Sequence, residues 1–123
     1  MLCQQIFFSL DSKVAIYVPS TVNTNELDKN SLQKYFENLV LSEFSELFGG
    51  ATATSARGAW MSPEAGLVTE DVTVIYSFCR DDDFKDNFDK VVALAGLICK
   101  GMNQEAVTLE YNNKVAFITP EMS

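Results

Sequence analysis

The sequence predicts an α+β domain with a ferredoxin-like βαββαβ core and a hairpin extension at each terminus. Two helical stripes alternate with short β-prone runs in the order ββαββαββ, and removing the terminal additions leaves that core. The chain has 123 residues, of which 47% are hydrophobic, which suits a single domain over residues 1–123. We expect two helices on one face of an antiparallel sheet. The opposite face is expected to be open and rich in Thr, Ser and Ala.

The N-terminal part predicts two strands and a loop. Residues 5–10 and 13–18 are β-prone runs on either side of Asp11 and Ser12, which indicates a first hairpin. Pro19 ends the second run. Residues 20–25 are polar and turn-prone, so we expect a loop there.

A first helix is predicted over residues 31–48. Asn30 suits the N-cap, with Gln33 three residues later, and Gly49 and Gly50 supply the stop. One helical stripe carries the apolar side chains Leu32, Phe36, Leu39, Val40, Leu47 and Phe48.

Two strands follow, over residues 51–61 and 67–78, joined by a turn at 62–66. The second strand alternates clearly, which indicates a half-buried strand. Glu70 belongs by parity to its apolar face and is unusual there. The other members of that face are Val68, Val72, Val74, Tyr76 and Phe78.

The C-terminal part predicts a second helix and a hairpin. Three acids at residues 81–83 open the helix, where they complement its dipole, and Lys100 and Gly101 close it. Residues 105–111 alternate again. Asn112 and Asn113 form a turn that tolerates positive φ, so residues 114–118 fold back as a final strand.

Composition excludes several kinds of chemistry. The chain has no histidine, which removes the usual general base and the commonest metal ligand, and we expect neither a metal nor a cofactor. No phosphate-binding, dinucleotide-binding or serine-hydrolase motif is present. The three cysteines form no C-x-x-C motif and are interpreted as reduced thiols of a cytoplasmic protein.

The charge and the apolar runs bear on partners. A formal net charge of −8 disfavours nucleic acid and anionic membranes as partners, and it favours a basic protein if the acidity serves binding. No apolar stretch approaches the ~20 residues that span a bilayer, and the first residues do not resemble a secretory signal.

The most distinctive pattern joins residues 57–60 to residues 66–70 across the turn. If Trp60 pairs near Val68, then Gly58 lies opposite Glu70 and leaves space for its carboxylate. On the other face, Arg57 would then lie opposite Asp71. Two interpretations stay open. Glu70 is either a general acid or base beside an Arg57 anion clamp, or an anchor that accepts backbone N–H bonds.

Four further residues complete the candidate set. Gln104 and Glu105 lead the last core strand, and Glu105 shares the parity of the apolar positions that follow. Glu70 and Glu105 would make an acid–base pair, but we expect their strands to start at opposite ends of the sheet. In the 20–25 loop, Thr21 and Asn23 offer hydroxyl and amide groups to a small ligand or to their own backbone.

Several of these residues carry a resemblance. Gly58 and Trp60, then Gly66 with Leu67 and Glu70, then residues 104–107 follow the pattern G-x-W, G-x-x-x-E, Q-E-[SA]-V. The chain thereby resembles a family of small uncharacterised bacterial α+β proteins, a domain of unknown function. Residues 16–21 are similar to small proteins carried by plasmids and phages of gut bacteria. The resemblance implies a ferredoxin-like fold and supplies no activity.

Small size, the lack of histidine and the acidic surface favour a non-enzymatic binding or interaction module. We expect it to form a homodimer or larger homo-oligomer, of the kind that serves as an accessory or counter-defence protein of a mobile element. The alternative is a small-molecule site, either a sequestering pocket or a small enzyme, near Arg57, Trp60 and Glu70. In that site Trp60 stacks a planar ligand and Arg57 holds an anionic group.

Overall fold

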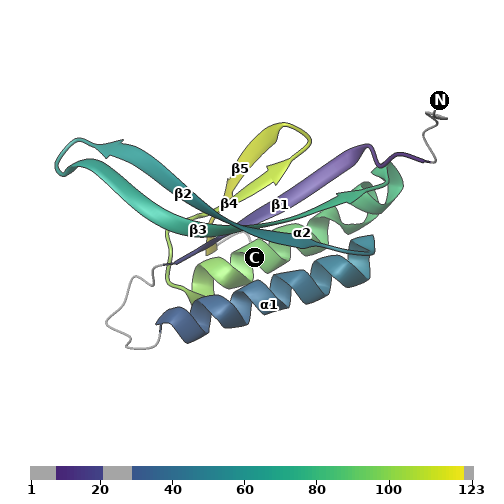
Figure 1. Ribbon diagram of the computed structural model, residues 1–123, viewed down its shortest axis with the longest axis horizontal. Helices are drawn as coiled ribbons and strands as arrows, with labels where there is room; N and C mark the ends of the chain where they lie inside the picture. Colours follow the sequence, from purple (N-terminus) through teal and green to yellow (C-terminus); the bar gives the residue numbers. More distant parts are fainter. Residues whose placement is uncertain (1–7, 21–28, 121–123) are drawn as a thin grey trace, which may run out of the picture.

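The computed structural model describes residues 8–20 and 29–120, and in that part of the chain two helices cover one face of a five-stranded sheet (Figure 1). The strand order is β2-β3-β1-β4-β5, and every neighbouring pair is antiparallel. This architecture confirms the ferredoxin-like α+β prediction. In chain order the elements are β1 (Ser12–Pro19), α1 (Lys29–Phe48), β2 (Thr52–Ser62), β3 (Gly66–Cys79), α2 (Asp81–Gly101), β4 (Val107–Tyr111) and β5 (Lys114–Ile118).

Strand β1 lies at the centre of the sheet and supplies the middle of the core. Its helix-facing side chains Val14, Ile16 and Val18 are fully buried. They pack in one cluster with apolar residues of both helices and of β3, β4 and β5. Its other face, which carries Lys13 and Tyr17, points away from the helices because side chains alternate along a strand.

The apolar face of β3 is the open face, so the prediction of an open face rich in Thr, Ser and Ala is wrong. Ile75, Ser77 and Cys79 are the buried, helix-side residues of this strand. Hydroxyl groups on that side find partners, since Thr73 Oγ1 donates to Glu37 Oε2 at 2.8 Å and Ser77 Oγ donates to the Gly50 carbonyl at 2.6 Å. Polar groups can be buried at little cost when they are hydrogen-bonded in this way.

Two hairpins rise from the sheet on the side away from the helices. Figure 1 shows the β2–β3 hairpin extending past the helix layer as a long arm and the β4–β5 hairpin rising beside it. The predicted C-terminal hairpin is confirmed, with Asn112 and Asn113 at φ values of 47° and 68°.

Two details at the start of the chain differ from the predictions. Residues 8–11 form no strand, and the rest of the expected first strand, residues 5–7, lies outside the described residues. Helix α1 begins at Lys29, so Asn30 lies inside the helix and is not its N-cap.

Gly101 lets the two helices approach closely, and its replacement is the first test of the packing. A Cβ atom at Gly101 would lie 2.3 Å from Phe36 Cζ and 2.8 Å from Cε2, and Phe36 is buried. We expect Gly101→Ala to lower the free energy of unfolding by about 1–2 kcal/mol, because overpacking outweighs the better helix propensity of alanine. Urea unfolding of the purified variant measures this loss.

Gly58→Ala is the matched control for that variant. A Cβ atom there meets only the Glu70 carbonyl oxygen, at an ordinary 3.9 Å. We expect its unfolding midpoint to equal that of the wild type or to rise. Equal stability of the Gly101→Ala variant and the wild type would contradict the close contact between Gly101 and Phe36.

Candidate functional site

A groove of about 540 Å³ lies on the open face, between the β2–β3 arm and the β4–β5 hairpin. Strand β1 supplies its floor and ends at Pro19, which pairs with Val72, so the arm continues beyond the end of β1. Aromatic, aliphatic and a few polar side chains line it, as is usual in small-molecule sites. The lining residues are Tyr17, Pro19, Ala56, Arg57, Gly58, Ala59, Trp60, Glu70, Val72, Gln104, Ala106, Val107, Thr108 and Phe117.

Four of the predicted site residues, Arg57, Trp60, Glu70 and Gln104, line this groove together. The predicted register of the arm is confirmed, with Trp60 opposite Val68 and Arg57 opposite Asp71. Trp60 is 58% exposed, so its ring offers a free face to a ligand. Glu70 is half-buried on the same face of the arm.

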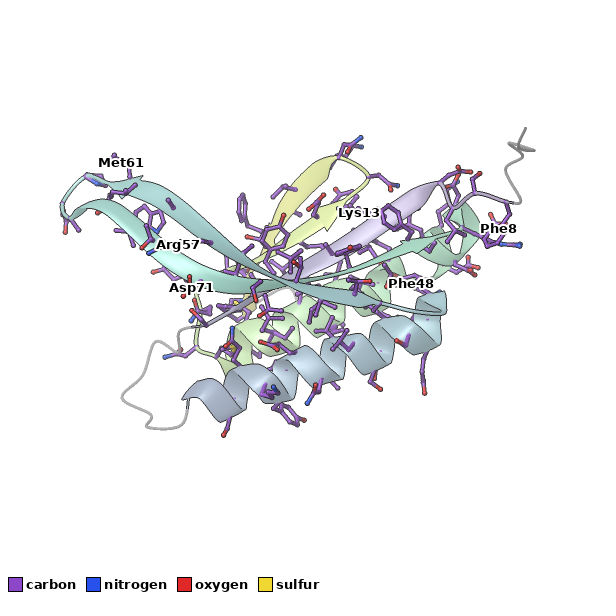
Figure 2. All side chains as sticks on the ribbon, in the orientation of Figure 1. Phe8, Lys13, Phe48, Arg57, Met61 and Asp71 are labelled. Atoms are coloured by element: carbon purple, nitrogen blue, oxygen red, sulfur yellow. The ribbon has the colours of Figure 1, made fainter. Side chains whose placement is uncertain are left out.

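Arg57 forms a loose cross-strand ion pair on the surface of the arm. Its Nε atom lies 4.0 Å from Asp71 Oδ1, and the two side chains are 74% and 81% exposed (Figure 2). Exposed pairs of this kind contribute about 0–1 kcal/mol. By strand alternation this pair lies on the face of the arm opposite Trp60 and Glu70. The Arg57 guanidinium would therefore have to release Asp71 and turn around the edge strand to reach an anionic ligand group in the groove.

The remaining predicted residues lie elsewhere. Glu105 is exposed and does not line the groove, and Thr21 and Asn23 lie outside the described residues. The expectation that the strand containing Glu70 and the strand led by Glu105 start at opposite ends of the sheet is wrong. Because β3 and β4 are both antiparallel to β1, they run parallel to one another and start at the same end.

Gly58 does not have the steric role that the sequence indicated. Its Cβ position is open except for ordinary contact with the Glu70 carbonyl oxygen. Gly58 lies opposite Glu70 as predicted, but the Glu70 carboxylate does not require that space.

Tyr17 and Phe117 are groove residues that the sequence analysis did not select. Tyr17 lies between two fully buried core residues, Ile16 and Val18, so its alternation with them signalled an outward side chain. Phe117 pairs with Thr108 and is 66% exposed. Strand parity identifies both positions once the helix-facing side of the sheet is known.

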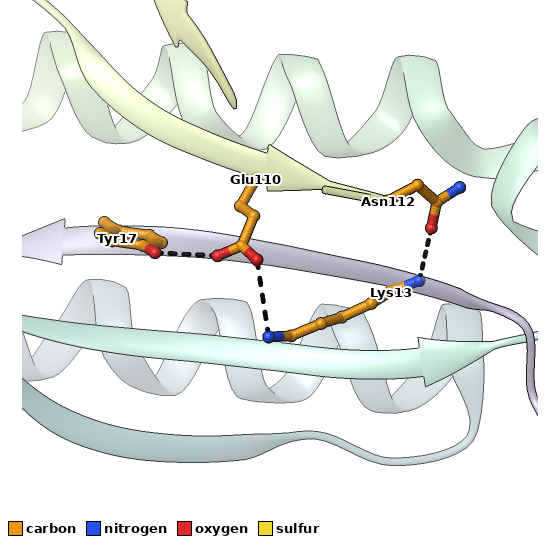
Figure 3. Close-up of polar contacts among 4 residues, drawn as sticks. All are labelled: Lys13, Tyr17, Glu110 and Asn112. Carbon is orange, nitrogen blue, oxygen red and sulfur yellow. Dashed lines mark hydrogen bonds and ion pairs between the residues drawn. The ribbon is translucent and has the colours of Figure 1, made fainter. Parts of the chain in front are cut away.

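A polar cluster adjoins the groove floor and fixes Tyr17 (Figure 3). The Tyr17 hydroxyl donates to Glu110 Oε1 at 2.8 Å, and Lys13 Nζ lies 3.6 Å from Glu110 Oε2. The hydrogen bond to Glu110 raises the pKa of Tyr17, and burial and the Glu110 charge add to the rise. Tyr17 therefore remains a neutral phenol in neutral solution.

A second cavity of about 620 Å³ lies on the helix side of the arm and shares Arg57 with the groove. Its other lining residues are mostly polar, among them Gln33, Ser55 and Asp71. We favour the groove as the ligand site because it combines aromatic faces with a carboxylate and an amide.

Within residues 8–20 and 29–120, no three His, Cys, Asp or Glu side chains come together to hold a metal ion. Neither helix in the described part of the chain has the length and apolar character needed to cross a bilayer.

Two solved structures share this fold over nearly the whole chain. One is of a phage SAM lyase in complex with S-methyl-5′-thioadenosine, with 21% identity, a TM-score of 0.60, and coverage of 94% of this chain and 96% of that chain. Another is of a phage SAM lyase in the apo state, with 19% identity, a TM-score of 0.59 and coverage of 96% of each chain. No protein-family model and no curated protein matches the chain. The resemblance to an uncharacterised bacterial family therefore stays a prediction.

These structures correct the expectation of a non-enzymatic interaction module. That expectation used small size, the absence of histidine and the absence of a catalytic motif as arguments against catalysis. Both similar structures are of an enzyme, of nearly the same extent as this chain. The alternative, a small-molecule site or small enzyme near Arg57, Trp60 and Glu70, agrees better with the comparison.

The raised pKa values of Tyr17 and Cys79 predict that the protein loses stability at alkaline pH. The pKa of Tyr17 lies above its ordinary 10.0. Burial, then the Asp83 and Asp81 charges, raise the pKa of the Cys79 thiol from 9.0 to about 11. Both folded pKa values are raised, so each group's stabilisation is complete below its ordinary pKa and is lost as pH rises through the folded value.

We therefore expect the urea midpoint to fall as pH increases from 9 through 11. In the Glu110→Leu variant the part of this fall above pH 10 should shrink, because leucine cannot accept the Tyr17 hydrogen bond, which is the main cause of the raised Tyr17 pKa. An identical alkaline profile in wild type and variant would contradict Glu110 as the cause.

Proposed function

We propose that this chain is a small lyase that cleaves S-adenosylmethionine and releases S-methyl-5′-thioadenosine in the groove on the open face. The observation that carries the proposal is the likeness to a phage SAM lyase in complex with that thioadenosine, over 94% of this chain. The groove on the same chain holds aromatic, acidic and basic side chains that suit each part of such a substrate.

The substrate has three chemically distinct parts, and the groove offers a partner to each. Adenine is planar and stacks on an aromatic face such as that of Trp60. The sulfonium and ammonium groups are cationic and are attracted by the Glu70 carboxylate and by aromatic rings. The substrate carboxylate matches the guanidinium of Arg57, which its exposed ion pair holds only weakly.

The reaction is compatible with a site that has no histidine. The bond between the sulfonium sulfur and the γ-carbon of the amino-acid chain breaks, and its electron pair passes to sulfur, which leaves as a neutral thioether. The carbon receives a pair either from the substrate's own carboxylate, which closes a lactone, or from a neighbouring C–H bond whose proton Glu70 accepts. In both routes the leaving group departs neutral and needs no proton from the protein.

The negative charge of the chain favours binding of the substrate over binding of the product. The chain carries a formal net charge of −8, which attracts a cationic substrate more than a neutral thioether product. Glu70 does the same at short range, since its attraction for the ligand weakens when the sulfonium charge disappears. Product release is thereby assisted by the same carboxylate that attracts the substrate.

The exposed apolar side chains of the open face support a homodimer or larger homo-oligomer as the working form. Phe78, Val115 and Phe117 are each at least half exposed on this face, which also carries the exposed groove residue Trp60. A second copy that covers this face would bury them and narrow the groove. Cys79 and Cys99 are thiols, which suits the reducing cytoplasm.

The first test is turnover. We expect the purified protein to convert S-adenosylmethionine to S-methyl-5′-thioadenosine, measured by chromatography of the products. Glu70→Gln should lower kcat/KM by about a hundredfold, as expected for a lost general base or charge-stabilising group. The matched control is Glu105→Gln, which removes an exposed acid outside the groove and should keep wild-type kinetics. A wild-type protein that forms no S-methyl-5′-thioadenosine contradicts the proposed reaction.

The second test is direct binding. Trp60 is the single tryptophan of the chain, so its fluorescence reports the groove alone. We expect S-methyl-5′-thioadenosine to change this emission saturably. In calorimetric titration, Trp60→Ala should weaken binding roughly 5- to 100-fold, because stacking of one base contributes about 1–3 kcal/mol. Tyr35→Ala, which removes an exposed aromatic ring from α1, is the control and should bind like wild type. Unchanged emission at high ligand concentration would argue against the groove as the adenine site.

A further inference from the structure

Tyr17 is held in the groove floor by two residues that do not themselves line the groove. Its hydroxyl donates to Glu110 Oε1 at 2.8 Å, while the other oxygen of Glu110 pairs with Lys13 Nζ at 3.6 Å (Figure 3). Tyr17 and Lys13 come from β1 and Glu110 from β4, so the sheet itself brings the three together.

Lys13 is fixed in turn on both its backbone and its side chain. Its backbone N–H donates to Asn112 Oδ1 at 2.8 Å. Its ammonium group lies 5.1 Å from the centre of the Tyr76 ring and 5.8 Å from that of Phe78, which are cation–π distances. The Glu110 carboxylate therefore has a fixed cation on one oxygen and the Tyr17 hydroxyl on the other.

This arrangement determines what Tyr17 offers to a ligand. A phenol has one proton to donate and lone pairs that accept. The proton is committed to Glu110, so in any further hydrogen bond the Tyr17 oxygen acts only as an acceptor. A ligand group that meets it must bring an N–H or O–H donor.

We infer that Tyr17 contacts the ligand as a hydrogen-bond acceptor for a nitrogen-borne donor, and that Glu110, held by Lys13, positions it for that contact. The inference rests on the proposed function, since the substrate offers two such donors: the ammonium of its amino-acid part and the exocyclic amine of adenine. Tyr17 is then a specificity-determining residue, and Glu110 is a positioning residue that acts through it.

The cluster of Lys13, Tyr17 and Glu110 contributes little to the stability of the fold, so we expect its variants to fold. It lies on the open face, with the Lys13 and Glu110 side chains 36% and 22% exposed, where ion pairs contribute little to stability. The Tyr17 ring is half-buried, and phenylalanine would fill the same space.

The experiment is a double-mutant cycle with Tyr17→Phe, Glu110→Leu and the double variant. For each protein, KM and kcat for S-adenosylmethionine, Kd for S-methyl-5′-thioadenosine and the melting temperature are measured. We expect Tyr17→Phe to raise KM about three- to tenfold with kcat largely kept, as for one lost hydrogen bond. Glu110→Leu should raise KM by a smaller factor, and it should add nothing in the Tyr17→Phe background.

The thioadenosine identifies which donor Tyr17 accepts, because it lacks the amino-acid part. A raised KM with an unchanged Kd for the thioadenosine assigns Tyr17 to the ammonium, and a rise in both assigns it to the adenosine part, where the adenine amine is the nitrogen-borne donor. Glu105→Leu is the matched acid-to-leucine control and should behave as wild type. Glu110→Ala replaces Glu110→Leu if the latter does not fold, with the same non-additivity expected.

Three contrary results would overturn different parts of this inference. Turnover by the wild type with unchanged KM and Kd in Tyr17→Phe overturns the contact and leaves the proposed function standing. An undiminished Glu110 effect in the Tyr17→Phe background overturns the positioning role. A wild-type protein that neither turns over S-adenosylmethionine nor binds the thioadenosine overturns the proposed function and this inference together.

Discussion

The pairing of β1 with β3 determines what every other part of the structure can do. Side chains alternate along a strand, so this register decides that Val14, Ile16 and Val18 face the helices, while Lys13 and Tyr17 face outward. A slip of one residue would exchange the two sets, placing charged and phenolic groups in the core. The fully buried valines and isoleucine fix the register against that exchange, and the open face is constructed on its other side.

The groove exists because β1 is shorter than its neighbour. Strand β1 ends at Pro19, while β3 extends beyond it and pairs with β2 to form the arm. Among the described residues no strand continues β1 beyond Pro19, and the β2–β3 arm and the β4–β5 hairpin stand on either side (Figure 1). Glu70 and Trp60 lie on the part of the arm that passes this end, which is why they line a concave site although they belong to an exposed edge.

A small acidic fold without histidine is suited to a substrate that carries its own leaving group. A sulfonium departs as a neutral thioether, so the protein does not have to protonate it. In the proposed reaction, what remains for the protein is to bind a cation, stack a planar base and exclude water, and carboxylate and aromatic side chains serve these purposes. The absence of histidine and of known motifs therefore says little about catalysis here, and for this physical reason it misled the functional expectation.

The sequence by itself determined the order of the elements from β1 to β5 and the register of the β2–β3 arm. Trp60 opposite Val68 and Arg57 opposite Asp71 follow from a short turn that ends at Gly66, whose φ of +76° suits glycine, so only local information is needed.

Only the tertiary structure decided which face of β3 is inside, because alternation separates two faces without indicating which one is buried. Thr73 and Ser77 face inward because Glu37 and Gly50, which are distant in sequence, accept hydrogen bonds from their hydroxyl groups. The same holds for Tyr17, whose partner Glu110 lies on another strand. Long-range partners of this kind leave no local pattern, and they decided both the composition of the open face and the floor of the groove.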